Sequence, residues 1–225
     1  MENENNAVNP AAYDAEMRQT YPFYDEFHRQ IIETVRVHCK EPVSWLDIGS
    51  GTGTLAARAF QSLPVSKMIC CEHHAALLDA ARLRLPHPQT VFMQKNILHL
   101  ALRERFDVIT AVQSLHTLTM EEREQTVRSC YEKLRPNGIF LTFENILPFS
   151  QTGTDYAMIL WTEYQKRMGK TDARCEAFLA DYREKCRPVT ISEQLSLLRR
   201  CGFEIAELLW CSGMQAGFYG IRTAR

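Results

Sequence analysis

The segment from Val43 to Thr54 constrains the fold more than any other part of the chain. Its apolar run ends in Asp47, and Gly49, Gly51 and Gly53 follow at every second position before an Ala-rich segment begins. The apolar run predicts a buried strand, and the glycines predict a sharp turn into a helix. Glycine lets such a turn adopt positive φ and lets a ligand approach the backbone closely. Asp47 would repel a pyrophosphate at this turn and attract a cationic ligand.

The glycine spacing separates two classes of nucleotide-binding turn. A dinucleotide site has G-x-G-x-x-G with an acid about 20 residues later, whereas here G-x-G-x-G follows Asp47. This pattern resembles the first motif of the class I S-adenosylmethionine (SAM)-dependent methyltransferases and argues against an NAD-dependent dehydrogenase. The resemblance is specific over roughly residues 42–145. It implies S-adenosyl-L-methionine as cofactor, with contacts from Asp47, Gly49, Ser50, Gly51 and Gly53.

Strands and helices alternate along the chain, which predicts a parallel sheet with helices on both faces. We expect strands after Pro42 and over 65–71, 90–94, 106–112, 139–143, 203–209 and 217–221, and helices beginning near residues 24, 54, 74, 121, 156, 172 and 190. The last two strands predict an antiparallel hairpin. The fold class is therefore α/β, a Rossmann-like methyltransferase fold with a mostly parallel seven-stranded sheet, an antiparallel end and a helical lid.

We expect one domain over residues 1–225. Within it, residues 1–40 would form an N-terminal helical lid and 42–145 the cofactor-binding core. Residues 147–190 would form a helical insertion, and 191–225 the final helix and hairpin. Residues 1–12 are expected to be loosely packed.

Glu72 ends the second predicted strand, 25 residues after Asp47. The resemblance implies that Glu72 accepts hydrogen bonds from the ribose hydroxyls; its alternative is an exposed acid at a helix start. His73 would edge the adenosine or be a surface histidine. Asn96 stands where the family often has an acid for the adenine amine, and its amide oxygen can still accept that bond. Ile97 would flank the adenine or belong to the core.

The segment Phe106 to Leu118 resembles the fourth strand of small-molecule methyltransferases, which commonly ends in Leu-His-x-Leu. Backbone near Val112 would line the methionine portion. His116 is a candidate general base because its ordinary pKa is near neutrality. We favour the alternative that His116 hydrogen-bonds nearby backbone and fixes a loop.

The aromatic segment from Met17 to Asp25 resembles the leader that these enzymes fold across the cofactor. Tyr24 would line the methyl-transfer site as a second candidate catalytic residue, and Arg18 would pair with the cofactor carboxylate. Packing is the alternative role for the aromatic residues. Trp161 and Tyr164 share one helix face, so they would roof an apolar substrate pocket or dock the lid.

Three functions share this cofactor. The first is methyl transfer to a small-molecule acceptor. The second is a carboxy-SAM synthase of transfer-RNA wobble modification, which the lid layout loosely resembles. It needs a lid arginine, and Arg174, Arg183 and Arg187 are all candidates. The third is a SAM-binding protein without turnover.

Composition narrows the partners and the compartment. Net charge is −1, without the basic cluster that extended nucleic-acid contact needs. No apolar run of about 18 residues predicts a membrane span. The eight cysteines show no metal spacing, so we expect reduced thiols, no metal and a cytoplasmic location. The sequence does not determine the oligomeric state and allows a homodimer.

Overall fold

A computed structural model describes residues 10–99 and 102–224 of the chain and confirms the predicted fold class. Seven strands form one sheet in the order β3-β2-β1-β4-β5-β7-β6, in which only β7 runs antiparallel to its neighbours. The strands are β1 (Val43–Ile48), β2 (Val65–Glu72), β3 (Thr90–Gln94), β4 (Phe106–Val112), β5 (Leu134–Asn145), β6 (Ile205–Ser212) and β7 (Gln215–Ile221). The helices are α1 (Pro10–Thr20), α2 (Tyr24–His38), α3 (Thr54–Ser62), α4 (Ala75–Arg84), η1 (Ile97–His99), α5 (Met120–Lys133), α6 (Gln151–Arg167), α7 (Asp172–Lys185) and α8 (Ile191–Arg200).

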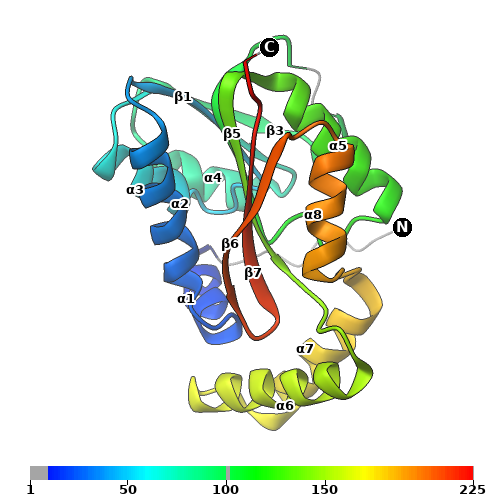
Figure 1. The fold of residues 1–225 in the computed structure, drawn as a ribbon. Coiled ribbons are helices and arrows are strands. Elements are labelled where there is room, and N and C mark those ends of the chain that lie inside the picture. Colours follow the sequence, from blue (N-terminus) through cyan, green and yellow to red (C-terminus); the bar gives the residue numbers. More distant parts are fainter. Residues whose placement is uncertain (1–9, 100–101, 225) are drawn as a thin grey trace.

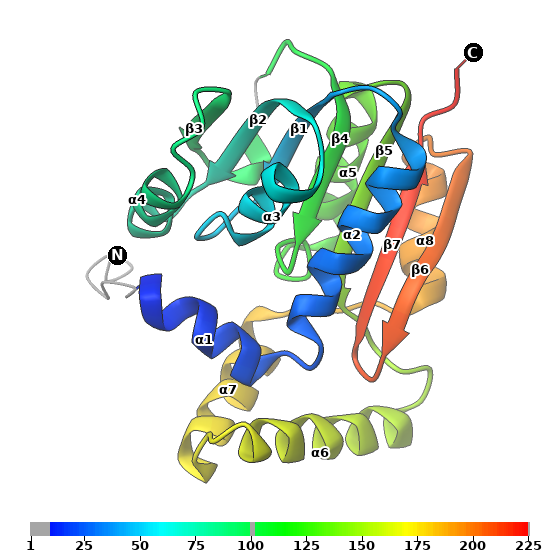
Figure 2. The ribbon, with the colours of Figure 1, turned by 90° about the vertical axis from the view of Figure 1, so that its left-hand side faces the viewer.

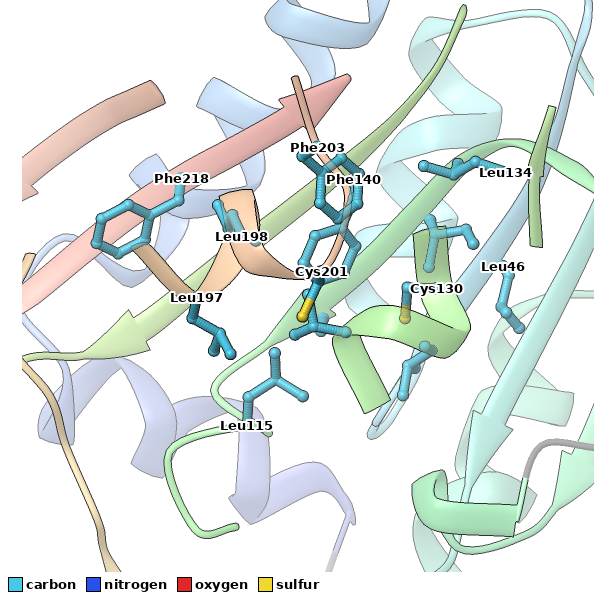
Figure 3. Packing of buried hydrophobic residues seen from close by; sticks show 14 of the residues in the cluster. Leu46, Leu115, Cys130, Leu134, Phe140, Leu197, Leu198, Cys201, Phe203 and Phe218 are labelled. Carbon is cyan, nitrogen blue, oxygen red and sulfur yellow. The ribbon is translucent and has the colours of Figure 1, made fainter. Parts of the chain in front are cut away.

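The central strands are buried on both faces because helices cover each side of the sheet. Figures 1 and 2 show α2 and α3 on one face and α5 and α8 on the other. Adjacent strand residues point to opposite faces. Trp45 accordingly packs with α2 and α3, while Leu46 packs with α5 and α8. Figure 3 shows the cluster that contains Leu46, in which Phe140 stacks on Phe203 and Leu198 lies beside them.

The sheet places a ligand site at the carboxyl ends of its parallel strands. The strand order reverses between β1 and β4, which is the topological switch point where such folds bind ligands. In Figure 2, α1, α6 and α7 lie beyond the strand ends. Trp161 and Tyr164 of α6 donate hydrogen bonds to the carbonyls of Thr20 and Arg18, at 2.6 and 2.8 Å. These bonds dock α6 on the end of α1.

The structure differs from the sequence prediction in three places: α1, α2 and the start of β5. Helix α1 already begins at Pro10, whereas loose packing was expected through residue 12; residues 1–9 lie outside the described residues. Helix α2 packs in the core through Phe27 and Ile31, so only α1 from the predicted N-terminal lid crosses the strand ends. Strand β5 begins at Leu134 and not at residue 139 as expected, because Pro136 to Gly138 are held within the strand as an irregularity.

Candidate functional site

The glycine turn connects β1 to α3 with a backbone that other residues would strain. Gly49, Gly51 and Gly53 all have positive φ, at 65°, 54° and 76°. A Cβ on Gly49 would lie 2.8 Å from the Cβ of Ser114, which is closer than van der Waals contact. The amides of Gly49 and Ser50 both donate to the Cys71 carbonyl at the end of β2. The turn is therefore fixed against both neighbouring strands.

Asp47 is a buried carboxylate without an ion-pair partner among the described residues. Its Oδ1 accepts a 2.7 Å hydrogen bond from Thr110, whose hydroxyl accepts from the Trp45 indole at 2.8 Å. Burial raises the pKa of Asp47 to about 7, and the hydrogen bond from Thr110 only partly offsets this. A buried charge is costly unless it is paired. Asp47 therefore favours a cation that would come from a ligand.

Glu72 ends β2 and joins the glycine turn to the start of α4. Its Oε2 accepts the Gly51 amide at 3.0 Å, and its Oε1 accepts the amides of His73 and His74 at 2.8 and 2.9 Å. The side chain is 5% exposed. His73 Nδ1 also lies 3.0 Å from Oε1. Because the Gly51 amide is the one hydrogen-bond partner of Oε2 among the described residues, this oxygen keeps a lone pair for a ligand hydroxyl while Glu72 orders the turn.

Helix α1 is tied to the glycine turn by Asp14. The Asp14 carboxylate accepts hydrogen bonds from the hydroxyls of Thr52 and Thr54 and forms an ion pair with Arg84. Tyr13 lies beside Gly51, so that a Cβ on this glycine would be 3.6 Å from its ring. The N-terminal segment thus covers the turn, as the resemblance predicted for a leader, but through residues that were not predicted.

Two adjoining cavities surround the turn and share Tyr13, Gly49 and Val112. The smaller, which we call the turn cavity, is lined mainly by the turn, α1 and α2. It includes Tyr24, His28 and Asp47. The larger, which we call the strand-end cavity, has a volume of about 480 Å³ and follows the ends of β2, β3 and β4. This volume lies in the range of small-molecule sites.

Four predicted contacts meet in the strand-end cavity. Glu72, His73, Asn96 and Ile97 all line it. The Asn96 amide oxygen accepts the Leu98 amide at 3.0 Å and so caps η1; its second lone pair remains for a ligand. The arrangement has the polar and apolar groups that an adenosine needs.

The end of β4 contributes backbone strain to the same cavity. Gln113 has a φ of 52°, which is uncommon for a residue with a side chain, and its amide donates to Phe143 O at 2.7 Å. Its buried side-chain amide has no hydrogen-bond partner. Val112 lines both cavities. Strained residues with unsatisfied polar groups gather at functional sites.

His116 lies behind the cavities and lines neither of them. Its Nδ1 is 2.7 Å from Glu144 Oε2, and Glu144 also accepts the Leu115 and His116 amides and the Thr142 hydroxyl. Burial lowers the pKa of His116, but hydrogen bonds with Cys186 and Glu144 outweigh burial and raise it to about 9. A histidine that keeps its proton is a poor general base, so this geometry favours the alternative role of fixing the loop.

The two predicted N-terminal residues have different surroundings. Tyr24 is buried, lines the turn cavity and packs its ring 4.8 Å from that of His28. Arg18 instead forms a bidentate ion pair with Asp25 and lines neither cavity. The predicted pairing of Arg18 with a cofactor carboxylate would require this ion pair to open.

Several cavity residues were not predicted from the sequence. His28 could have been found, because it lies one helical turn after Tyr24 and therefore shares its face. No local signal marks the cavity residues Tyr13 and Gln113, whose positions depend on contacts between distant segments. Among the described residues, no cluster of His, Cys, Asp and Glu is placed to bind a metal ion. None of the described helices has the length and apolarity of a membrane crossing.

Comparison with known proteins agrees with this geometry. A family described as a methyltransferase domain matches residues 46–140. Carboxy-S-adenosyl-L-methionine synthase from Desulfotalea psychrophila is 25% identical, over 87% of this chain and 82% of its own length. The enzyme of the same name from Nautilia profundicola is 21% identical, over 89% and 86%. The structure of human N-acetylserotonin methyltransferase in complex with SAM superposes with a TM-score of 0.64 at 15% identity, covering 94% of this chain and 55% of that one.

The fold, the glycine turn and the methyltransferase-domain match together define the class of protein. The domain match over residues 46–140, the relatives and the fold support a class I SAM-dependent methyltransferase. The domain match and the carboxy-S-adenosyl-L-methionine synthase relatives support an enzyme that uses S-adenosylmethionine and argue against an NAD-dependent dehydrogenase.

Proposed function

We propose that this enzyme transfers the methyl group of SAM to a small-molecule acceptor. The observation that carries the proposal is the gathering of Asp47, the glycine turn and Glu72 around two adjoining cavities at the switch point of the sheet. Asp47 forms no ion pair within the described part of the chain, and the strand-end cavity has room for a nucleoside. These features fit a cofactor that is cationic at one end and an adenosine at the other.

The predicted residues divide between the two ends of this ligand. In the proposal, Asp47 and the backbone from Gly49 to Gly53, including Ser50, hold the methionine portion. Glu72 accepts the ribose hydroxyls, and His73, Asn96 and Ile97 border the adenine. Val112 lies where both cavities meet. Tyr24 lies in the turn cavity, close to the cationic end.

Little acid–base chemistry is required of the protein. The cofactor supplies a methyl group already activated by its sulfonium. The chain has to orient the acceptor in line with that methyl group and exclude water. Helix α1 provides the cover, since Tyr13 and Met17 close the turn cavity from outside. Tyr24 and His116 stay predicted contributors, of which only Tyr24 reaches a cavity.

The size of the acceptor is inferred from the lid. Tyr21, Trp161, Phe178 and Tyr182 pack their rings against one another between α1, α6 and α7. This aromatic packing holds α1, α6 and α7 together, and these helices lie beyond the carboxyl ends of the strands (Figure 2). A covered site favours a small acceptor over duplex nucleic acid.

A carboxy-SAM synthase is the second candidate, because relatives of that name match most of the chain. Such an activity would need a lid arginine for the added carboxylate. Arg174 pairs with Glu16 at 3.0 Å, and Arg187 donates to the carbonyls of Glu184 and Cys186. Arg183 lines a separate groove between α6 and α7. None of the three lines the cavities at the glycine turn, so methyl transfer is preferred.

Two measurements test the proposal. Calorimetry should detect SAM binding to the wild type, and Glu72→Ala should weaken it about 100-fold, since charged hydrogen bonds contribute roughly 1.5–3 kcal/mol each. Val91→Ala, on the exposed part of β3, is the control and should bind normally. Mass spectrometry of the copurified ligand then separates the candidates: SAM or its demethylated product supports methyl transfer, and a carboxylated SAM contradicts it.

We also propose that the enzyme is cytoplasmic. All eight cysteines are free thiols, which suits a reducing cytoplasm. Thiol titration of protein purified without reductant should count eight groups after denaturation; oxidised pairs would contradict a cytoplasmic enzyme. A homodimer stays a prediction, for which sedimentation is the direct test.

A further inference from the structure

His28 is a buried histidine of the turn cavity that neither the sequence prediction nor the methyl-transfer proposal uses. It lies on the inner face of α2 and is 2% exposed. Its Nδ1 is buried and has no hydrogen-bond partner among residues 10–99 and 102–224. Asp47 lines the same cavity. Buried polar atoms are nearly always hydrogen-bonded, so an unpartnered imidazole beside a ligand cavity indicates that the ligand supplies the partner.

The other basic groups nearby are already engaged. Arg18 and Arg58 both pair with Asp25, and Arg84 pairs with Asp14. Among the described residues that line the turn cavity there is neither lysine nor arginine. His28 is thus the basic side chain of this cavity that is free to meet an anion.

Burial keeps His28 uncharged and Asp47 only partly ionised near pH 7. The pKa of His28 is lowered to about 3, mainly by burial and also by the charges of Arg58 and Arg18, while Asp25 and Asp14 act in the opposite direction. Burial also raises the pKa of Asp47 to about 7, which the charge of Glu72 reinforces. The cavity thus contains one acid and one base, and each lacks a counter-charge.

We propose that His28 receives the α-carboxylate of the cofactor's amino-acid end, while Asp47 receives its cationic part. The pair would then select a zwitterionic α-amino acid over an adenosyl ligand that lacks the carboxylate. This inference rests on the proposed cofactor site and assigns it a specificity-determining residue. The imidazole takes up a proton as the carboxylate arrives. That proton comes from Asp47 below about pH 7 and from solvent above it.

The decisive experiment compares SAM with decarboxylated SAM by calorimetry. The wild type should prefer SAM by about 30-fold, as expected for one charge-assisted hydrogen bond. In His28→Phe, which keeps a ring against Tyr24, this preference should fall to about twofold or less. His28→Gln, which keeps a neutral donor, should retain an intermediate preference. An undiminished preference in a folded His28→Phe variant would overturn the proposal.

The pH dependence gives a second readout that packing alone would not produce. The SAM affinity of the wild type relative to His28→Phe should grow as pH falls from 8 to 6, up to about tenfold per pH unit. Titration of the ligand's own ammonium cancels in this ratio. A ratio independent of pH would contradict proton uptake by His28.

The outcome separates this inference from the cofactor proposal. Absence of SAM binding to the wild type would reject the cofactor site as a whole. Normal SAM binding with unchanged discrimination in His28→Phe would reject only the role of His28. The Glu72→Ala variant serves as the matched control, because it should weaken SAM and decarboxylated SAM by the same factor.

Discussion

Asp47 and Glu144 are two buried carboxylates at the carboxyl ends of strands in the same sheet, yet their surroundings differ. Glu144 accepts hydrogen bonds from two backbone amides, a hydroxyl and His116. Asp47 has a hydroxyl partner, no ion pair among the described residues, and a cavity beside it. The first acid is satisfied within the fold, and the second is left for a ligand. Burial alone therefore does not identify a binding residue; the identity of its partners does.

The largest expected effect tests the Glu144 side of this comparison. Glu144→Ala removes the partner of His116, whose side chain is 4% exposed, and the acceptor of two buried amides and the Thr142 hydroxyl, which should reduce the free energy of unfolding by about 3–5 kcal/mol. Denaturant unfolding at pH 7 measures this loss. The folded fraction should keep its SAM affinity within about threefold. A mild loss of stability with a large loss of affinity would reverse the roles of the two acids.

The second prediction concerns Asp47, whose replacement should stabilise the fold, whereas replacement of Glu144 should destabilise it. The folded-state pKa of about 7 exceeds the ordinary value of 3.8, so the folded protein loses stability as pH rises from about 4 to 7. Asp47→Asn removes this penalty and should be roughly 3 kcal/mol more stable than wild type at pH 8. SAM affinity should fall about 100-fold by calorimetry. A variant that is less stable at pH 8 would show that the carboxylate is already paired.

The third prediction uses the pH dependence of His116. Its folded-state pKa of about 9 lies above the ordinary 6.5, so its contribution is fully present below pH 6.5 and is lost as pH rises through 9. We expect a loss of roughly 2 kcal/mol between pH 7 and 9, and His116→Gln should lack it. The difference between the two unfolding curves at each pH measures this term. If the His116→Gln variant is folded but has lost its methyltransferase activity, His116 would have a catalytic role.

The smallest expected effect concerns the attachment of α1. Asp14→Ala removes the acceptor of Thr52 and Thr54 and the partner of Arg84. Because the site is partly exposed, we expect a loss of about 1 kcal/mol in stability and a reduction in SAM affinity of about tenfold or less. Arg29→Ala, which removes an exposed pair on α2, is the control. An effect as large as that of Asp47→Asn would mean that α1 closure, not Asp47, dominates binding.

The sequence predicted the cofactor half of the molecule closely because its signals are local. Strands β3 and β4 have the predicted bounds, and α8 begins near residue 190 as predicted, where Thr190 and Glu193 form a capping box. Glu72 and Asn96 line one cavity, as strand-end positions in a parallel sheet predict. Asp47, Glu72 and Asn96 all line the two cavities, and their contacts with the cofactor stay predictions.

The remaining parts depended on contacts that no local pattern contains. The start of α1 at Pro10 and the extension of β5 to Leu134 were missed. Arg18 has the charge expected for a carboxylate partner, but Asp25 lies seven residues away and forms the ion pair. His28 looks in sequence like any polar position of a helix, and only the packing of α2 directs it into the turn cavity.

The sequence by itself determined the alternation of strands and helices, the glycine turn and the acid that precedes it. Hydrophobic period and glycine conformation are properties of neighbouring residues, so they can be read along the chain. Tertiary structure decided which buried charges are satisfied. Glu144 meets His116 and Asp47 meets a cavity because α1, α2 and the loop after β4 come together there. The energy of a buried charge depends on the groups that surround it in space, and the sequence alone does not show which groups these are.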